Sequence, residues 1–118
     1  KVWCVFGCGG DRDSGKRPQM GRAAQELADH IVITSDNPRS ENPDSIIAMI
    51  QAGMSGDLSN VQALPDRAAA IMAAVRHADI QDIVLVAGKG HESTQEINGK
   101  KFDFSDQEHI RLAAGGSV

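Results

Sequence analysis

The chain alternates short apolar runs with segments of helical periodicity, and this alternation constrains its fold more than any other feature. Apolar runs long enough for one strand each lie at residues 2–6, 30–36, 61–64 and 82–88. Segments with helical patterns separate consecutive runs. This order predicts a mainly parallel sheet in a Rossmann-like open α/β fold, with helices on both faces.

Helices are expected over residues 18–29, 42–53 and 66–77, where apolar residues recur at intervals of three and four. Asn42 and Asp66 are good N-caps for the second and third of these helices. The periodicities also predict which residues face the core: Met20, Ala23, Ala24 and Leu27 in the first helix, and Ala68, Ile71, Met72 and Val75 in the third.

The pattern changes after the fourth strand. An Asn-Gly pair within residues 95–104 separates two short runs, which is typical of a two-residue β-hairpin. Ser105 and Glu108 have the spacing of a capping box, which predicts a last helix over residues 106–114, followed by a frayed tail. The predicted fold class is therefore α/β with a C-terminal hairpin and helix, and the 118 residues fit one domain.

Charge and composition narrow the functional classes. The net charge of −4 argues against a nucleic-acid partner, because general affinity for nucleic acid needs a basic surface. No apolar stretch approaches the roughly 18 residues of a membrane span, so we expect no membrane partner. Cys4 and Cys8 would lie too far apart along one strand to form a disulfide, and we expect both to be reduced.

Glycines and charged residues are concentrated in the loops that follow the first, second and fourth strands. These loops read GCGGDRDSGKR at 7–17, SDNPRS at 35–40 and AGKGHES at 87–93. In an open parallel sheet they meet at the carboxyl edge of the strands, where ligands bind. The pattern therefore predicts a binding site at that edge. Taken alone, the second loop is equally well interpreted as a helix-capping turn with a solvated arginine.

The first loop looks like a nucleotide-binding P-loop. Gly10 to Lys16 has the spacing G-x-x-x-x-G-K, but Arg17 stands where a Ser or Thr would hold Mg²⁺. Asp11 and Asp13 would also repel phosphate oxygens. Two interpretations remain: the glycines serve only a tight strand-to-helix turn, or the loop contacts a ligand that carries charges of both signs.

Together the three loops offer cations and carboxylates, which suits a zwitterionic ligand such as an amino acid. Arginine forks clamp carboxylates, and a residue such as Glu92 would accept an ammonium group. We see no nucleophile paired with a base and no histidine or cysteine pair at zinc spacing, so we expect no catalytic residue and no metal site. The charged residues concerned are Arg12, Lys16, Asp36, Arg39, Lys89 and Glu92.

Three motifs, GCGGDRDSGKRPQMG, TSDNPR and VLVAGKGHE, resemble the C-terminal domain of the Mur ligases in order and spacing. The resemblance covers essentially the whole chain. It implies that residues 1–118 are one domain of a longer, three-domain enzyme of the bacterial cytoplasm. Such enzymes use ATP and Mg²⁺, held mainly by a central domain absent here, to join an amino acid to a peptidoglycan precursor through an acyl phosphate.

The DNPR motif resembles that of the members that add meso-2,6-diaminopimelate to UDP-MurNAc-L-Ala-D-Glu. The resemblance implies that the partners are these substrates, ATP, and the enzyme's own N-terminal and central domains. It also implies that Asp11 and Lys16 approach the ATP phosphates and that the isolated domain is inactive. The residues implied to contact diaminopimelate are Arg12, Asp36, Asn37, Pro38, Arg39, Gly88 and Glu92.

Two other functions stay open at this point. One is a stand-alone module that binds a small anionic metabolite or a nucleotide. The other is a related ligase domain of the folylpolyglutamate type, which adds glutamate. DNPR argues against the second, because the pattern suits an amino acid with a distant second carboxylate. The residues that precede Lys1 in the natural protein would distinguish a stand-alone binding module from a ligase domain.

Overall fold

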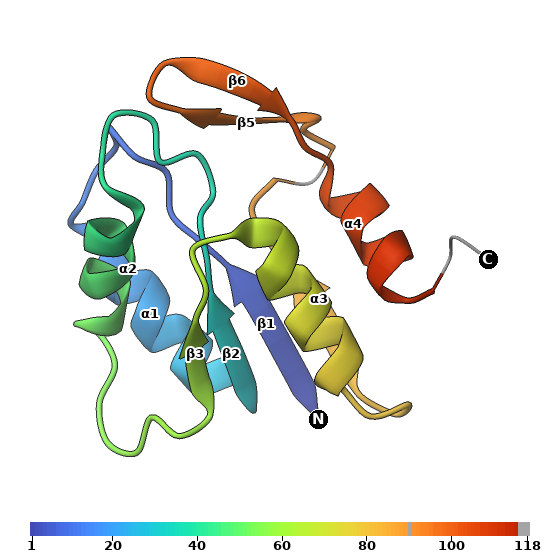
Figure 1. Cartoon of the computed structure of the whole chain (residues 1–118). Coiled ribbons are helices and arrows are strands. Elements are labelled where there is room, and N and C mark those ends of the chain that lie inside the picture. The colour runs from blue at the N-terminus through green and yellow to red at the C-terminus, as the bar shows by residue number, and fades with distance from the viewer. Residues whose placement is uncertain (90, 116–118) are drawn as a thin grey trace.

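The structure of the chain, a computed structural model, describes residues 1–89 and 91–115. Gly90 of the third loop and residues 116–118 of the expected tail lie outside them. The predicted alternation is confirmed, and the helices begin and end within two residues of the predicted positions (Figure 1). The elements are β1 (Val2–Phe6), α1 (Lys16–Leu27), β2 (His30–Ile33), α2 (Pro43–Gln51), β3 (Val61–Ala63), α3 (Arg67–His77), β4 (Ile83–Val86), β5 (Thr94–Ile97), β6 (Lys100–Asp103) and α4 (Asp106–Ala113).

A four-stranded parallel sheet with the order β3-β2-β1-β4 forms the centre of the fold. Helices α1 and α2 pack on one face and α3 packs on the other, which confirms the Rossmann-like class (Figure 1). β2 and β4 end earlier than predicted, at Ile33 and Val86. The polar residues beyond them leave the ladder and form the loops at the carboxyl edge.

Alternate residues along the strands divide the core into two aliphatic layers. Each central strand contributes to both layers, as a parallel sheet covered on two faces requires. The layer beneath α1 and α2 contains Phe6, Ile31, Ile33, Ile46, Ile47 and Ile50. The layer beneath α3 contains Trp3, Val5, Val32, Ala70, Ile71 and Ala74.

The predicted core-facing stripe of α1 is largely wrong. Of its four residues only Ala24 is buried; Ala23 is exposed, and Met20 and Leu27 are 42% and 80% exposed, whereas the unpredicted Gly21 is buried. Gly21 lies against the backbone of α2, and a Cβ there would be 2.0 Å from the carbonyl oxygen of Ile50. The helix therefore packs on α2 through its glycine side, which rotates the apolar stripe toward the edge strand β4.

In α3 the predicted stripe is only partly right. Ile71 is fully buried as expected, but Met72 is 45% exposed. Ala70 and Ala74 are buried in its place, because small side chains let this helix lie close to the sheet. The apolar periodicity predicted where both helices lie in the sequence, but not which side of each helix faces the core.

The C-terminal part follows the prediction closely. β5 and β6 pair antiparallel, and Asn98 and Gly99 at the turn have φ values of 52° and 75°, as a type I′ turn requires. The hydroxyl of Ser105 accepts a hydrogen bond from the Glu108 N–H and caps α4. α4 packs on α3, and the hairpin lies beyond the carboxyl edge of the sheet (Figure 1). Among the described residues, no helix is long and apolar enough to cross a membrane.

Candidate functional site

The loops that follow β1, β2 and β4 meet at the carboxyl edge of the sheet, as predicted. A cleft of about 360 Å³ opens between them. Arg12 and Lys16 line it from the first loop, Asp36 from the second and Gly88 from the third. The cleft therefore carries charges of both signs, which suits a zwitterionic ligand better than a purely anionic one.

The glycines of the first loop serve a close approach to the second loop. The Gly10 N–H donates to the Asn37 carbonyl at 2.7 Å, and a Cβ on Gly10 would be 1.8 Å from the Pro38 oxygen. A Cβ on Gly7 would similarly meet the Thr34 oxygen at 2.2 Å. These contacts support the interpretation of the glycines as packing residues, because the Gly10 amide is bound to protein and cannot cradle a phosphate.

Arg17, which breaks the P-loop pattern, is a buried structural residue. Its Nη1 and Nη2 donate to the two carboxylate oxygens of Glu41 at 2.9 and 2.8 Å, and Nη2 also donates to the Gly9 carbonyl. The two hydrogen bonds from Arg17 to the Glu41 carboxylate, together with one from the Asp11 N–H, lower the pKa of Glu41 to about 2. The hydrogen bond to Glu41 in turn raises the pKa of Arg17. This pair fixes the first loop against the segment that follows Arg39.

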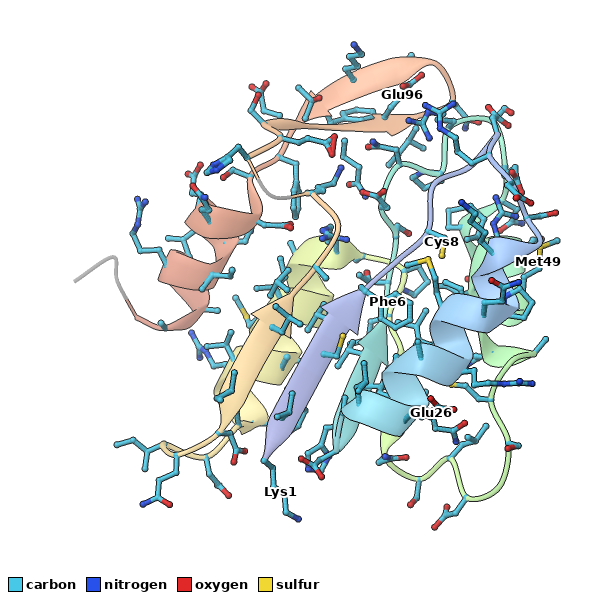
Figure 2. All side chains as sticks on the ribbon, turned by 180° about the vertical axis from the view of Figure 1, so that it is seen from behind. Lys1, Phe6, Cys8, Glu26, Met49 and Glu96 are labelled. Atoms are coloured by element: carbon cyan, nitrogen blue, oxygen red, sulfur yellow. The ribbon has the colours of Figure 1, made fainter. Side chains whose placement is uncertain are left out.

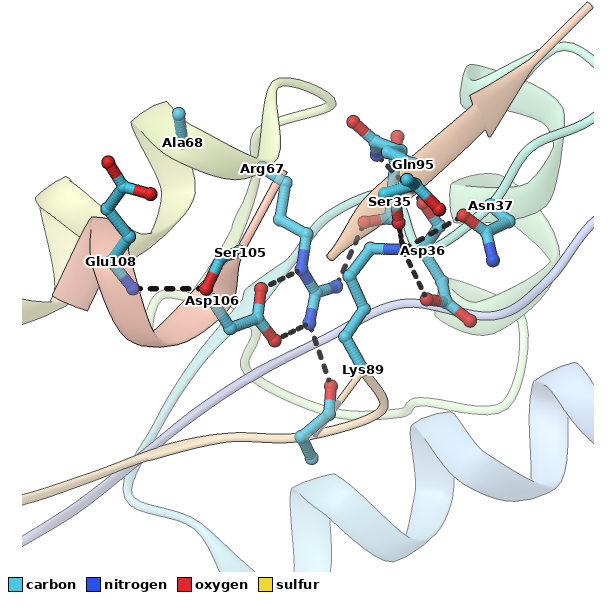
Figure 3. Close-up of polar contacts among 12 residues, drawn as sticks. Ser35, Asp36, Asn37, Arg67, Ala68, Lys89, Gln95, Ser105, Asp106 and Glu108 are labelled. Carbon is cyan, nitrogen blue, oxygen red and sulfur yellow. Dashed lines mark hydrogen bonds and ion pairs between the residues drawn. The ribbon is translucent and has the colours of Figure 1, made fainter. Parts of the chain in front are cut away.

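Lys89, which we expected to be a cation facing the ligand, is buried and holds the second loop (Figure 3). Its Nζ donates to Asn37 Oδ1 at 2.8 Å and to the Thr94 carbonyl at 3.1 Å, and lies 3.4 Å from Asp36 Oδ1. Asn37 Oδ1 also accepts a hydrogen bond from the Glu96 N–H. The side-chain amide oxygen of Asn37 is thus bonded to the protein.

Arg67 supports the same loops from the core side (Figure 3). Its Nε and Nη2 donate to the carboxylate of Asp106, both at 2.7 Å. Nη1 donates to the Ser35 carbonyl and Nη2 to the Ala87 carbonyl, at the start of the second and third loops. Both side chains of the ion pair are nearly inaccessible to solvent. This residue therefore sets the spacing of two of the three loops.

Arg39 lies between the first loop and the hairpin. Its backbone has φ of 53°, and it exchanges hydrogen bonds with β5 and the turn: its N–H donates to Glu96 and its carbonyl accepts from Asn98. Its Nη1 donates to the Gly10 carbonyl at 2.9 Å, and Nε lies 3.6 Å from the Glu96 carboxylate. The side chain is 20% exposed, and its Nη1 lies against Gly9, which lines the cleft.

Of the remaining predicted residues, Asp36 is the best placed for a ligand. It lines the cleft with a side chain that is 20% exposed, and its buried Oδ1 lies 3.4 Å from the Lys89 Nζ. Asp11 instead turns its carboxylate to Ser40, whose hydroxyl donates to it at 2.6 Å. Pro38 is buried, and Glu92 is exposed and is not one of the residues that line the cleft. The structure thus gathers part of the predicted set at the cleft and places the rest around it.

Sequence reasoning missed Glu41 and Asp106 as partners of buried arginines. Each is far from its arginine in sequence, and no local spacing relates the two. One signal was present: Arg17 and Arg67 both lie in the first turn of a helix, where the helix dipole disfavours a cation. A cation in that position calls for a nearby carboxylate. No group of three or more His, Cys, Asp or Glu residues in the described ranges is placed to hold a metal ion.

Comparison with known proteins adds three findings. Residues 1–90 match the family model described as "Mur ligase, glutamate ligase domain". The chain is 66% identical over 113 residues to the UDP-N-acetylmuramoyl-L-alanyl-D-glutamate–2,6-diaminopimelate ligase of Ralstonia nicotianae, covering 96% of this chain and 22% of that protein. It is 56% identical over 118 residues to the ligase of the same name from Janthinobacterium sp. strain Marseille, covering 100% of this chain and 23% of that protein.

A solved structure bearing the same ligase name superposes with a TM-score of 0.92 at 45% identity. The match covers 99% of this chain and 24% of that one. The chain therefore spans about a quarter of the length of the relatives that it matches.

Proposed function

This chain belongs to the Mur ligase family, in the part described as the glutamate ligase domain, and from that premise we propose that it is the amino-acid-binding domain of a longer ligase. The enzyme adds meso-2,6-diaminopimelate to UDP-MurNAc-L-Ala-D-Glu at the expense of ATP. The names of relatives that are 66% and 56% identical support this substrate. The observation that carries the proposal is the cleft at which loops with charges of both signs meet.

In this function the cleft residues bind the two ends of the amino acid. Arg12 and Asp36 line the cleft, where Arg12 faces one carboxylate of the amino acid and Asp36 accepts an ammonium hydrogen bond. Arg39, whose Nη1 lies against the cleft-lining Gly9, faces the other carboxylate. Gly88, with φ of 116°, lets the ligand approach the backbone, and Glu92 joins the site when the domains close. Asn37 and Pro38 act mainly by shaping the loop, because the side-chain amide oxygen of Asn37 is bonded to the protein and Pro38 is buried.

The domain contributes binding and orientation to the reaction. The carboxylate of the precursor is activated as an acyl phosphate, the amine held at this cleft attacks the carbonyl carbon, and phosphate leaves. The described residues do not gather a set of ligands suited to Mg²⁺. As the family resemblance implies, we assign ATP and Mg²⁺ mainly to the rest of the longer enzyme, with Lys16 and the Asp11 loop near the phosphates on closure. The isolated domain is then inactive, and the enzyme works in the bacterial cytoplasm.

Selectivity of the full-length enzyme tests this function. We expect Arg39→Ala to lower kcat/KM for meso-2,6-diaminopimelate by about 30- to 4,000-fold, since losing one partner of a charge-assisted pair costs about 2–5 kcal/mol. The value for L-lysine, which lacks the distal carboxylate, should change little. Arg22→Ala, an exposed arginine on α1, is the matched control. Undiminished preference for diaminopimelate would reject the role of Arg39, and faster turnover of L-glutamate would indicate the folylpolyglutamate type.

A further inference from the structure

Half of the sheet is uncovered on the α1 face. Seen from that side, α1 crosses in front of β2, while no helix of the described chain lies over β1 and β4 (Figure 2). Ile83 and Leu85 of β4 point to this side and are 64% and 54% exposed. Val84 and Val86 point to the other side and pack against the core beneath α3. An edge strand with apolar residues on both faces is typical of a parallel sheet that is covered twice.

An apolar groove of about 230 Å³ follows this uncovered half, and we call it the α1–β4 groove. Met20 and Leu27 of α1 form one wall and Leu85 forms the other. Val2 and Cys4 of β1 lie between the walls, and all residues that line the groove are apolar. The stripe of α1 that we predicted to face a core thus faces this groove. The prediction was wrong for the described chain, but the pattern is that of a helix with apolar neighbours on two sides.

We propose that the α1–β4 groove is the docking site of an amphipathic helix from the segment that precedes Val2 in the longer chain. The proposal rests on the proposed function in one respect, namely that this chain is a domain of a longer enzyme. The chain covers 22% and 23% of two relatives, so more than three quarters of each lies outside the match. There is ample chain to supply the helix.

Position favours the preceding segment over the following one. Val2 itself lines the groove, so a segment that enters β1 arrives at the groove's own end. α4 packs on α3, on the opposite face of the sheet, and the chain beyond it would have to cross the sheet to reach the groove. The five residues of β1 rise about 17 Å, which matches about 11 residues of helix lying antiparallel to the strand.

Alkylation of Cys4 measures whether the groove is occupied. Cys4 is half-buried and lines the groove, whereas Cys8 is buried and lies at the site cleft. Iodoacetamide labelling is followed residue by residue by mass spectrometry in three proteins: the 118-residue chain, the same chain with about 20 more natural residues before Lys1, and the full-length enzyme. Cys8 serves as the internal reference in each.

We expect Cys4 to react about tenfold or more slowly in the extended chain than in the 118-residue chain, because labelling then requires local opening. The full-length enzyme should give the same protection as the extended chain. Protection in the full-length enzyme alone would assign the groove to another part of the protein. Concentration-dependent protection of the 118-residue chain, with a dimer in solution, would assign it to a second copy. Either result overturns the proposal, as does equal labelling in all three proteins.

Leu85→Glu in the extended chain tests the contact directly. The charge should displace the helix and restore rapid labelling of Cys4, while the 118-residue chain, in which Leu85 is already half exposed, should keep its melting temperature. Ile80→Glu, a fully exposed apolar residue outside the groove, should change neither. Slow labelling in Leu85→Glu would contradict the proposal. These readouts do not depend on selectivity for diaminopimelate, so this proposal and the proposed function can fail separately.

Discussion

Two buried arginines hold the loops of the candidate site, one on each face of the sheet, and they differ in the solvent exposure of their partners. Arg67 at the start of α3 binds Asp106, whose side chain is 5% exposed. Arg17 at the start of α1 binds Glu41, whose side chain is 30% exposed. Each arginine uses two nitrogens on its carboxylate and also binds backbone carbonyls. The chemistry is the same, but the surroundings are not.

The difference teaches which part of the site is fixed and which can adjust. A carboxylate that stays buried when its arginine is removed is left as an unpaired charge, which is costly. A carboxylate at the rim regains water when its partner is lost. The second and third loops, held by Arg67, are therefore tied to the stability of the whole domain. The first loop, held by Arg17, can change its position without unfolding it.

The largest effect should come from Arg67→Met. The change leaves the Asp106 carboxylate buried and unpaired, so we expect the free energy of unfolding in urea to fall by about 3–5 kcal/mol. Arg76→Met is the matched control, because Arg76 is an exposed residue of the same helix whose side chain donates a hydrogen bond to the Ala113 carbonyl. If the two variants lost the same stability, the contrast between the buried and the rim pair would have no energetic basis.

Arg17→Met should have a smaller effect on stability and a larger one on substrate binding. It releases Glu41 to solvent and frees the first loop, which carries Arg12. In the full-length enzyme we therefore expect KM for diaminopimelate to rise while the melting temperature falls less than in Arg67→Met. A melting temperature lowered as far as in Arg67→Met, with an unchanged KM, would show that the two pairs act alike.

The smallest effect should be the pH dependence of stability that Glu41 contributes. The pKa of Glu41 is lowered to about 2 by the hydrogen bond from Arg17, against an ordinary value of 4.5. A carboxyl group whose pKa is lowered by folding stabilises the folded state at pH values above its ordinary pKa of 4.5. This stabilisation is lost as the pH falls toward 2. The stability difference between the wild type and Glu41→Gln should therefore be constant above about pH 5 and shrink below it.

Urea titrations at several pH values would measure that difference. Asp82, whose pKa is also lowered to about 2, titrates in both proteins and cancels. A difference that stayed constant down to pH 3 would show that Glu41 is not held as a carboxylate by Arg17.

The alternation of elements and the edge at which the polar loops meet were predictable from sequence, because both follow from local patterns. The apolar composition of a run such as residues 2–6 indicates that it is a buried strand. The topology of a parallel sheet then places the carboxyl ends of such strands together. The charged cluster at the cleft follows from those two facts. This is why Arg12, Lys16, Asp36 and Gly88, which come from three separate loops, line one cleft.

What escaped prediction depends on contacts between distant segments. Lys89 looked like a ligand-facing cation, but it is buried against Asn37 of another loop. The rotation of α1 is set by the approach of Gly21 to the backbone of Ile50, which helical periodicity does not encode. Partners such as Glu41 became visible only when the loops were packed against one another.

The left-handed backbone of Arg39 has a consequence for protein engineering. Residues other than glycine rarely adopt a backbone φ near 53°. At Arg39 this conformation is held by backbone hydrogen bonds to the β5–β6 hairpin. The conformation of the Asp-Asn-Pro-Arg loop therefore depends partly on residues 94–103. Transplanting the four residues into a ligase of different specificity would transfer their sequence but not their backbone conformation. A working graft therefore has to include the hairpin.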